Sequence, residues 1–153
     1  MESVDIAVQM FKDGNTCSQA MLYAFAPRFG MDQQLALKVS RAFGGGMGRM
    51  AGTCGAVTGA YMVLGLQYEA LDQQAKRPLF AQVQEFARRF SAMHGSIICR
   101  KMLPIDISTP EGGPAFKEMG LMQSHCIGFV ADAAQIVEDL LAEAQAAPAN
   151  KQG

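Results

Sequence analysis

The chain has 153 residues, half of them apolar, and its 13 basic and 14 acidic residues give a formal net charge of −1. A chain of this length forms one domain and buries roughly 70% of its unfolded surface, so it needs no disulfide to fold. The charged residues are interspersed without a basic stripe, which argues against nucleic acid binding.

The N-terminal segment MESVDIAVQMFKDG has acidic residues where a secretory signal would be basic, and it lacks a long apolar core. We therefore expect a cytoplasmic protein. Thiols stay reduced in that compartment, so the four cysteines are expected to serve catalysis, redox chemistry or metal binding rather than structural disulfides.

Helical spacing of apolar residues, together with capping residues and glycines, predicts most of the chain to be helical. The expected helices cover residues 4–12, 16–28, 33–43, 53–68, 72–94, 97–103 and 124–146. Residues 104–115 are expected to form an irregular loop, after which residues 115–120 could add a short helix. Residues 44–52 form a glycine-rich loop, because such a run fits neither a helix nor a strand.

The same spacing indicates which residues face the core. In the helix over 33–43, the residues expected inside are Leu35, Val39, Ala42 and Phe43. In the helix over 72–94, they include Phe80, Phe86, Phe90 and Met93.

Residues 50–68 carry no charge, which is typical of a membrane span. Their four glycines and Gln67 favour a central buried helix of a helical bundle instead, so we expect no membrane span. Because no strand pattern persists, the predicted fold is all-α, a compact single-domain bundle of five to seven helices over residues 1–146, with a flexible tail over 147–153.

Each of the four cysteines is expected in the first turn of a helix. Polar residues that commonly begin helices precede them, at Thr16, Thr53, Ser96 and Ser124; the cysteines are Cys17, Cys54, Cys99 and Cys126. The partial positive charge at a helix N-terminus favours a thiolate over a thiol. Four cysteines in such positions suggest a cluster of sulfur chemistry, with at least two Cα atoms within about 7 Å.

Cys54 has the strongest local signal. The glycine run before it can turn backbone N–H groups toward its sulfur, and Arg49 adds a positive charge. We therefore expect the pKa of Cys54 to be lowered. After Cys54, Gly55 and Gly59 lie on one helix face, where a second helix can approach closely.

The cysteine spacings of 37, 45 and 27 residues contain no C-x-x-C, so any pair or shared site must be made by the fold. Neighbouring thiols would cycle between dithiol and disulfide. Alternatively, the four cysteines, with His125 as a further ligand, would hold zinc or an iron–sulfur cluster. A third reading is a structural helical domain with inert buried thiols. His94 fits a positive charge at a helix C-terminus.

The segment CGAVTG, which begins at Cys54, matches a CGAxxG motif. Together with Cys17 before it and Cys99 and Cys126 after it, the chain resembles the C–GCAxxG–C–C family over roughly residues 4–142. The resemblance implies a redox-active protein with four defining cysteines and leaves its substrate open.

The leading hypothesis is a thiol-based redox protein in which Cys54 is the most activated thiol and one of Cys17, Cys99 and Cys126 resolves its disulfide. This chemistry is compatible with a thiol oxidoreductase acting on a redox partner or a small-molecule substrate, and with a homo-oligomer. No cofactor is required, although zinc or an iron–sulfur cluster belongs to the alternative.

Overall fold

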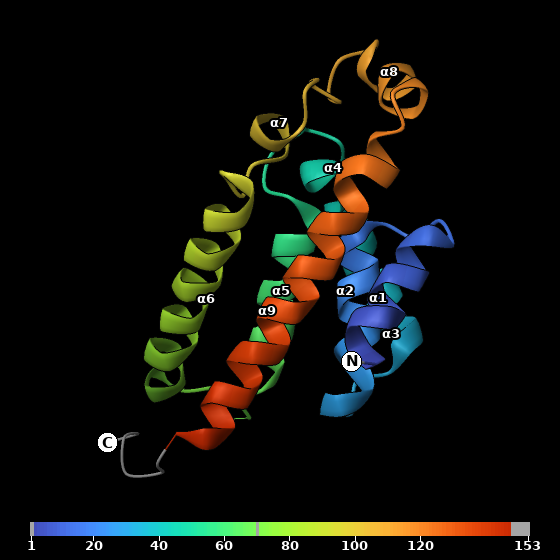
Figure 1. The fold of residues 1–153 in the computed structure, drawn as a ribbon. Coiled ribbons are helices and arrows are strands. Elements are labelled where there is room, and N and C mark those ends of the chain that lie inside the picture. The colour runs from blue at the N-terminus through green and yellow to red at the C-terminus, as the bar shows by residue number, and fades with distance from the viewer. Residues whose placement is uncertain (1, 70, 148–153) are drawn as a thin grey trace.

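A computed structural model describes residues 2–69 and 71–147, and this part of the chain is helical without a strand (Figure 1). The right-handed helices are α1 (Glu2–Lys12), α2 (Cys17–Phe25), α3 (Gln33–Ser40), α5 (Gly55–Leu66), α6 (Gln73–His94), α7 (Cys99–Met102), α8 (Gly112–Glu118) and α9 (Ile127–Ala146). The short element α4 (Gly44–Met47) contains left-handed residues. Two 3₁₀ turns (Ala26–Phe29 and Arg41–Phe43) and a π-helical turn (Met122–Cys126) complete the order.

The predicted all-α class is confirmed, but the count of five to seven helices is too low, since the described residues form eight. Part of the excess is α8, which begins within the segment expected to be a loop, with Pro114 in its first turn, where proline is well tolerated. The helix expected over 16–28 ends early, because Pro27 leads into a 3₁₀ turn that Gly30 closes at φ 73°. Residues 148–153 of the expected tail lie outside the described residues.

Helix α5 lies in the middle of the molecule, in contact with α2, α6 and α9. Its Val57, Val63 and Leu64 are fully buried. The predicted central buried helix is therefore confirmed, although at 12 residues it is shorter than residues 53–68. Among the described helices, none is both long and apolar enough to cross a membrane.

The contact between α2 and α5 depends on two glycines. A Cβ on Gly59 would lie 2.7 Å from Met21 Cβ and 3.1 Å from the Ser18 carbonyl oxygen. A Cβ on Gly55 would lie 2.5 Å from Cys17 Sγ. The close approach expected from the small face of this helix is confirmed, and α2 supplies the other side of the contact.

Several residues expected in the core are exposed instead. On α3, the buried residues are Ala36 and Ser40, which turns Leu35 and Val39 outward at 49% and 47% exposure. Ser18 explains this rotation, because its buried hydroxyl donates to the Ser40 carbonyl. Ala42 is also exposed, and Phe43 is half-buried.

Helix α6 is likewise only partly in the core. Phe86 and Phe90 are fully buried as predicted, whereas Phe80 and Met93 are 56% and 55% exposed. The reason is that α6 lies at the edge of the bundle, beside α5 and α9 (Figure 1). Its first half has no buried residue in the described structure.

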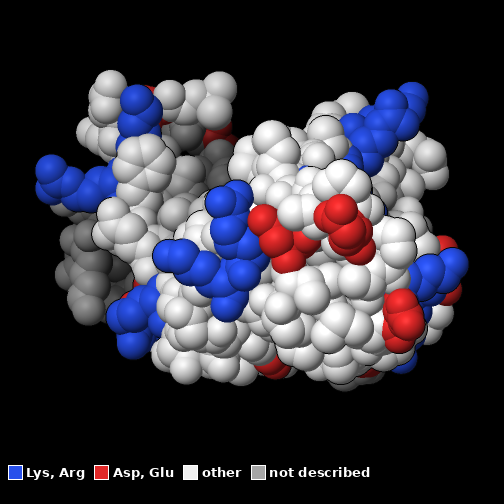
Figure 2. Space-filling model, turned by 90° about the horizontal axis from the view of Figure 1, so that it is seen from above, with Lys and Arg blue, Asp and Glu red and all other residues white. Residues whose placement is uncertain are grey.

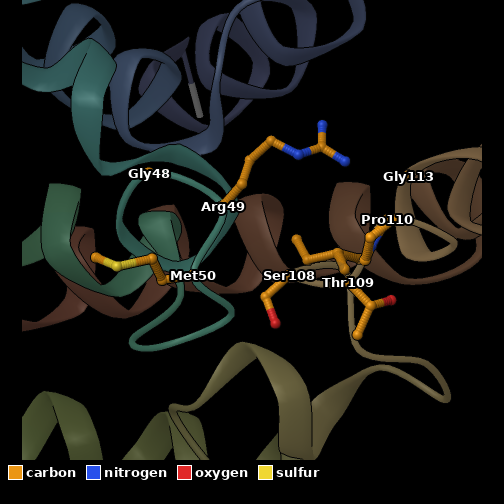
Figure 3. Close-up of a pocket in the computed structure, with 8 residues that line it drawn as sticks. Gly48, Arg49, Met50, Ser108, Thr109, Pro110 and Gly113 are labelled. Atoms are coloured by element: carbon orange, nitrogen blue, oxygen red, sulfur yellow. The ribbon is translucent and has the colours of Figure 1, made fainter.

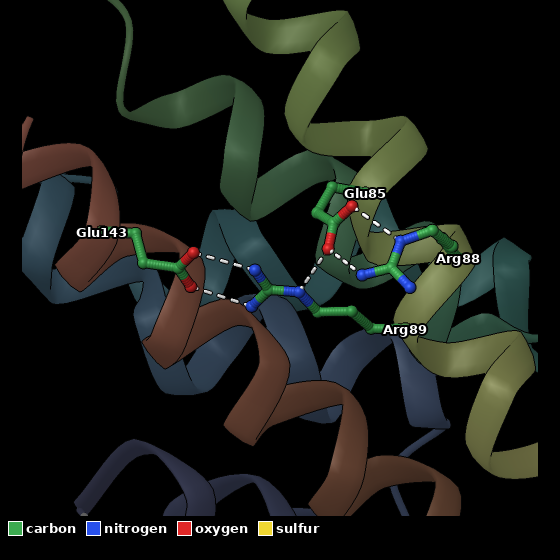
Figure 4. A network of polar contacts seen from close by, with 4 residues as sticks. All are labelled: Glu85, Arg88, Arg89 and Glu143. Atoms are coloured by element: carbon green, nitrogen blue, oxygen red, sulfur yellow. Dashed lines mark hydrogen bonds and ion pairs between the residues drawn. The ribbon is translucent and has the colours of Figure 1, made fainter.

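Charged side chains join α6 to α9 on the surface. Arg89 donates to both oxygens of Glu143 at 2.8 Å and to Glu85 at 2.6 Å, and Arg88 shares Glu85 (Figure 4). Exposed pairs of this kind stabilise by about 0–1 kcal/mol each. Seen from above, positive and negative side chains are scattered among larger uncharged areas (Figure 2).

We predict that Gly59→Ala lowers the free energy of unfolding by about 1–3 kcal/mol, because the new methyl group forces α2 away from α5. Gly65→Ala is the matched control on the same helix: nothing lies within 4 Å of its added Cβ. It should leave stability unchanged or raise it by about 0.5–1 kcal/mol through helix propensity. Urea unfolding of both variants measures the difference, and equal effects would contradict the tight contact.

Candidate functional site

Cys17 is the first residue of α2, where backbone N–H groups have no partner inside the helix. Thr16 caps this helix. Its hydroxyl accepts from the Gln19 N–H at 3.2 Å, and the Gln19 side chain accepts from the Thr16 N–H at 2.9 Å. The expected cap is confirmed, and it fixes Cys17 at the positive end of the helix.

The glycine-rich segment is not an irregular loop but a left-handed helical turn. Residues 45–49 all have φ between 64° and 70°, and Ala51 has φ 57°. Gly45, Gly46 and Gly48 adopt this conformation easily, whereas it costs Met47 and Arg49 about 1–2 kcal/mol each. Bonds such as Gly52 N–H to the Gly46 carbonyl, at 2.8 Å, close the turn.

The left-handed turn lies against the start of α2. A Cβ on Gly44 would lie 2.5 Å from Thr16 Cβ, so only glycine allows this approach. The backbone N–H of Gly45 then faces the sulfur of Cys17, together with the N–H groups of Ser18 and of Cys17 itself. The anion-binding arrangement expected around Cys54 therefore surrounds Cys17.

Cys54 lies beside Cys17. It is the N-cap of α5, and the Cys17 sulfur lies over the next residue, Gly55. A side chain at position 55 would displace that sulfur. The glycine after the cysteine in the CGAxxG motif is thus explained by the room that it leaves for Cys17.

The hydrogen bond between the two thiols shifts their pKa values in opposite directions. The Cys54 thiol stabilises a thiolate at Cys17 and, with the surrounding backbone N–H groups, lowers the pKa of Cys17 against the opposing effect of burial. The pKa of Cys54 is raised, because its hydrogen bond to Cys17 and its burial both favour the protonated form. Cys17 is partly exposed and Cys54 is 6% exposed.

The expectation that Cys54 has a lowered pKa is therefore wrong, and the thiol with the lowered pKa is Cys17. Arg49 does not act on Cys54 either, since its side chain extends over Gly45 toward Gly113. The glycine-rich segment does supply backbone N–H donors, as predicted. The fold directs them at Cys17, at the start of α2, instead of at Cys54.

Cys99 lies near Cys54 because residues 51–54 pair with residues 97–100. The Cys54 N–H donates to the Ile97 carbonyl at 2.9 Å, and the Cys99 N–H donates to the Gly52 carbonyl at 2.6 Å. In this antiparallel arrangement Cys54 and Cys99 occupy diagonal positions on one face. Burial raises the pKa of Cys99 to about 11.

Arg100 holds the left-handed turn in place. Its guanidinium donates to the carbonyls of Ala51 at 3.1 Å and Met50 at 3.0 Å. Its charge also opposes the rise in the pKa of Cys99. This bracing role leaves no local signal in the sequence, since Arg100 lies 50 residues after the carbonyl of Met50 that it contacts.

Cys126 is less activated than expected. It ends the π-helical turn that runs directly into α9, so it does not occupy a free helix N-terminus. Burial, and then the charge of Cys17, raise its pKa to about 12. The effect of Cys17 on both Cys99 and Cys126 places all four cysteines in one region of the fold.

The two histidines have other partners. The Nε2 atom of His94 lies 3.0 Å from the Asp132 carboxylate, and its ring packs against Phe90 and Phe129. The exposed Ser124 hydroxyl lies 2.7 Å from His125 Nδ1. Across residues 2–69 and 71–147, no group of three or more His, Cys, Asp or Glu side chains is placed to hold a metal ion.

A family model described as "Putative redox-active protein (C_GCAxxG_C_C)" matches residues 15–140, which include all four cysteines. The chain belongs to this family. No curated protein and no solved structure matches the chain. In this member of the C_GCAxxG_C_C family, the first cysteine and the cysteine of the CGAxxG motif are joined by a hydrogen bond between their thiols.

We predict that alkylation of Cys17 by iodoacetamide rises at lower pH than the value of about 8.5 typical of an unperturbed thiol. Cys54→Ala should move this rise to higher pH, because it removes the hydrogen bond that contributes most to the lowered pKa of Cys17. Cys54→Ser keeps a donor and should move it less. Peptide mapping of the labelled protein measures each site, and a rise unchanged in Cys54→Ala would show that the Cys54 hydrogen bond does not lower the pKa of Cys17.

Proposed function

We propose that this protein carries out dithiol/disulfide exchange, with Cys17 as the attacking thiol and Cys54 as the resolving thiol. The observation that carries the proposal is the contrast within one pair. Cys17 is partly exposed with a lowered pKa, whereas its neighbour Cys54 is buried with a raised pKa. A partly exposed cysteine with a lowered thiol pKa, beside a buried thiol, is an arrangement suited to two-step exchange.

The proposed reaction begins when the Cys17 thiolate attacks one sulfur of a substrate disulfide. A bond forms between Cys17 and that sulfur, and the other substrate sulfur leaves as a thiolate. Cys54 then loses its proton and attacks Cys17 Sγ, which releases the second substrate thiolate. The protein pair is oxidised by two electrons and the substrate disulfide is reduced to two thiols.

In the resting dithiol, the Gly45 and Ser18 N–H groups stabilise charge on Cys17. Once Cys17 has entered the mixed disulfide, that charge is gone, and the proton on Cys54 is no longer held by a neighbouring thiolate. The pKa of Cys54 then falls toward that set by its burial alone, which prepares it for the second step. This chemistry suits a reducing, cytoplasmic setting and a redox protein or small molecule as partner.

We predict that mild oxidation of the reduced protein forms one reversible intramolecular disulfide, between Cys17 and Cys54. Cys17→Ser and Cys54→Ser should each abolish it, whereas Cys99→Ser should retain it, because Cys99 has no part in the proposed steps. Mass spectrometry of protein alkylated before and after reduction identifies the bonded pair.

Metal analysis of the freshly purified protein tests the alternative in which cysteines hold zinc or an iron–sulfur cluster. One equivalent of metal, lost on chelation together with a lower melting temperature and with no oxidisable pair, would overturn the proposed function in favour of a metal site. A disulfide joining Cys99 to Cys126 while Cys17 stays reduced would refute the assigned roles.

A further inference from the structure

An open cavity of about 720 Å³ lies between the left-handed turn and the segment before α8. Small-molecule sites in proteins commonly have volumes of this order. Its wall combines the turn with a second loop and the start of α8: the lining residues are Gly48, Arg49, Met50, Ile107, Ser108, Thr109, Pro110 and Gly113 (Figure 3).

Two glycines fix the position of Arg49 in this cavity. A Cβ on Gly45 would lie 2.8 Å from Arg49 Cγ, and a Cβ on Gly113 would lie 2.9 Å from a terminal nitrogen of its guanidinium. The stem of the side chain therefore crosses one glycine and its charged end lies against the other. Figure 3 shows the side chain extended in this direction.

Arg49 is exposed, and within the described residues its guanidinium has neither an ion pair nor a hydrogen bond. This contrasts with Arg28 and Arg89, which have carboxylate partners on α9. The backbone of Arg49 is also held at φ 64°, in a region that arginine rarely adopts. A destabilising backbone conformation therefore holds an unpaired positive charge at the wall of the cavity.

Gly45 connects this cavity to the reactive sulfur. Its N–H donates toward the Cys17 sulfur, and a Cβ on Gly45 would lie 2.8 Å from Arg49 Cγ and 3.6 Å from Ile107 Cδ1. Gly45 therefore contacts both the Cys17 sulfur and two residues of the cavity wall, Arg49 and Ile107.

We propose that the cavity binds the carboxylate of a small anionic disulfide through the Arg49 guanidinium, so that the substrate of the Cys17–Cys54 pair is a small acidic molecule. The substrate assignment rests on the proposed function, whereas binding of a carboxylate at Arg49 does not. A guanidinium matches a carboxylate with two parallel hydrogen bonds, which a point charge cannot do equally well. The apolar Met50, Ile107 and Pro110 suit the short carbon chain of such a molecule.

Three disulfides of similar size test the preference for charge: 3,3′-dithiodipropionate, uncharged bis(2-hydroxyethyl) disulfide, and cationic cystamine. We expect Arg49→Gln to slow oxidation of the reduced protein by the dicarboxylate about tenfold, the range for loss of a charged hydrogen bond. The rate with the uncharged disulfide should stay within about twofold of the original, since it makes no such bond. Arg49→Lys should retain part of the rate, because it keeps the charge in the same backbone conformation.

Lys76→Gln is the matched control, since it removes one positive charge on the exposed, distant first half of α6. It should leave the rates with all three disulfides unchanged. An equal loss with all three disulfides in Arg49→Gln would overturn the proposal and indicate a structural role for Arg49. A loss in Lys76→Gln that matches the loss in Arg49→Gln would attribute the preference to net charge and would also overturn it.

Suberate separates this proposal from the proposed function, because it has the chain length of the dicarboxylate disulfide and cannot be reduced. We expect saturable shifts of the Gly48 and Met50 amide signals on titration with suberate, and their loss in Arg49→Gln. Suberate binding without any reaction of the disulfides would leave the anion site standing and defeat the redox pair. Oxidation of the pair with no suberate shift at millimolar concentration would defeat the anion site alone.

Discussion

The close contact between α2 and α5 is the constraint on which the rest of the site depends. Gly59 lets the helices approach, and Gly55 lets the Cys17 sulfur occupy the space where a side chain would otherwise be. With α2 held there, the left-handed turn can lie against Thr16 and direct the Gly45 N–H at that sulfur. A packing interaction in the core thus sets the protonation of a thiol at its edge.

The site and the bundle are supported by different parts of the chain. Fully buried apolar residues from α2, α5, α6 and α9 form the core, and Arg89 adds a surface link between α6 and α9. The segments that carry Cys54 and Cys99 are held instead by backbone hydrogen bonds between residues 51–54 and 97–100, and by the Arg100 guanidinium. A change in the turn can therefore alter the chemistry of the cysteines while the bundle remains folded.

Much of this fold could be predicted from local patterns. The Thr16 cap, the small face of α5 and the burial of Phe86 and Phe90 follow from residue type and helical spacing. The burial of α3 and the choice between Cys17 and Cys54 could not, because each depends on a contact between distant segments. The hydrogen bond from Ser18 to the Ser40 carbonyl sets which face of α3 is buried. The Gly45 N–H donates to Cys17, although Cys54 is nearer in sequence.

The donors around Cys17 have a consequence for the direction of electron flow. The Gly45 and Ser18 N–H groups interact with a negatively charged sulfur and gain little from the neutral sulfur of a disulfide. They therefore stabilise the reduced pair relative to the oxidised pair, which raises the reduction potential. A disulfide formed at this site would accept electrons readily from an external thiol, and the same donors would make the dithiol a weaker reductant of other disulfides than a pair without them.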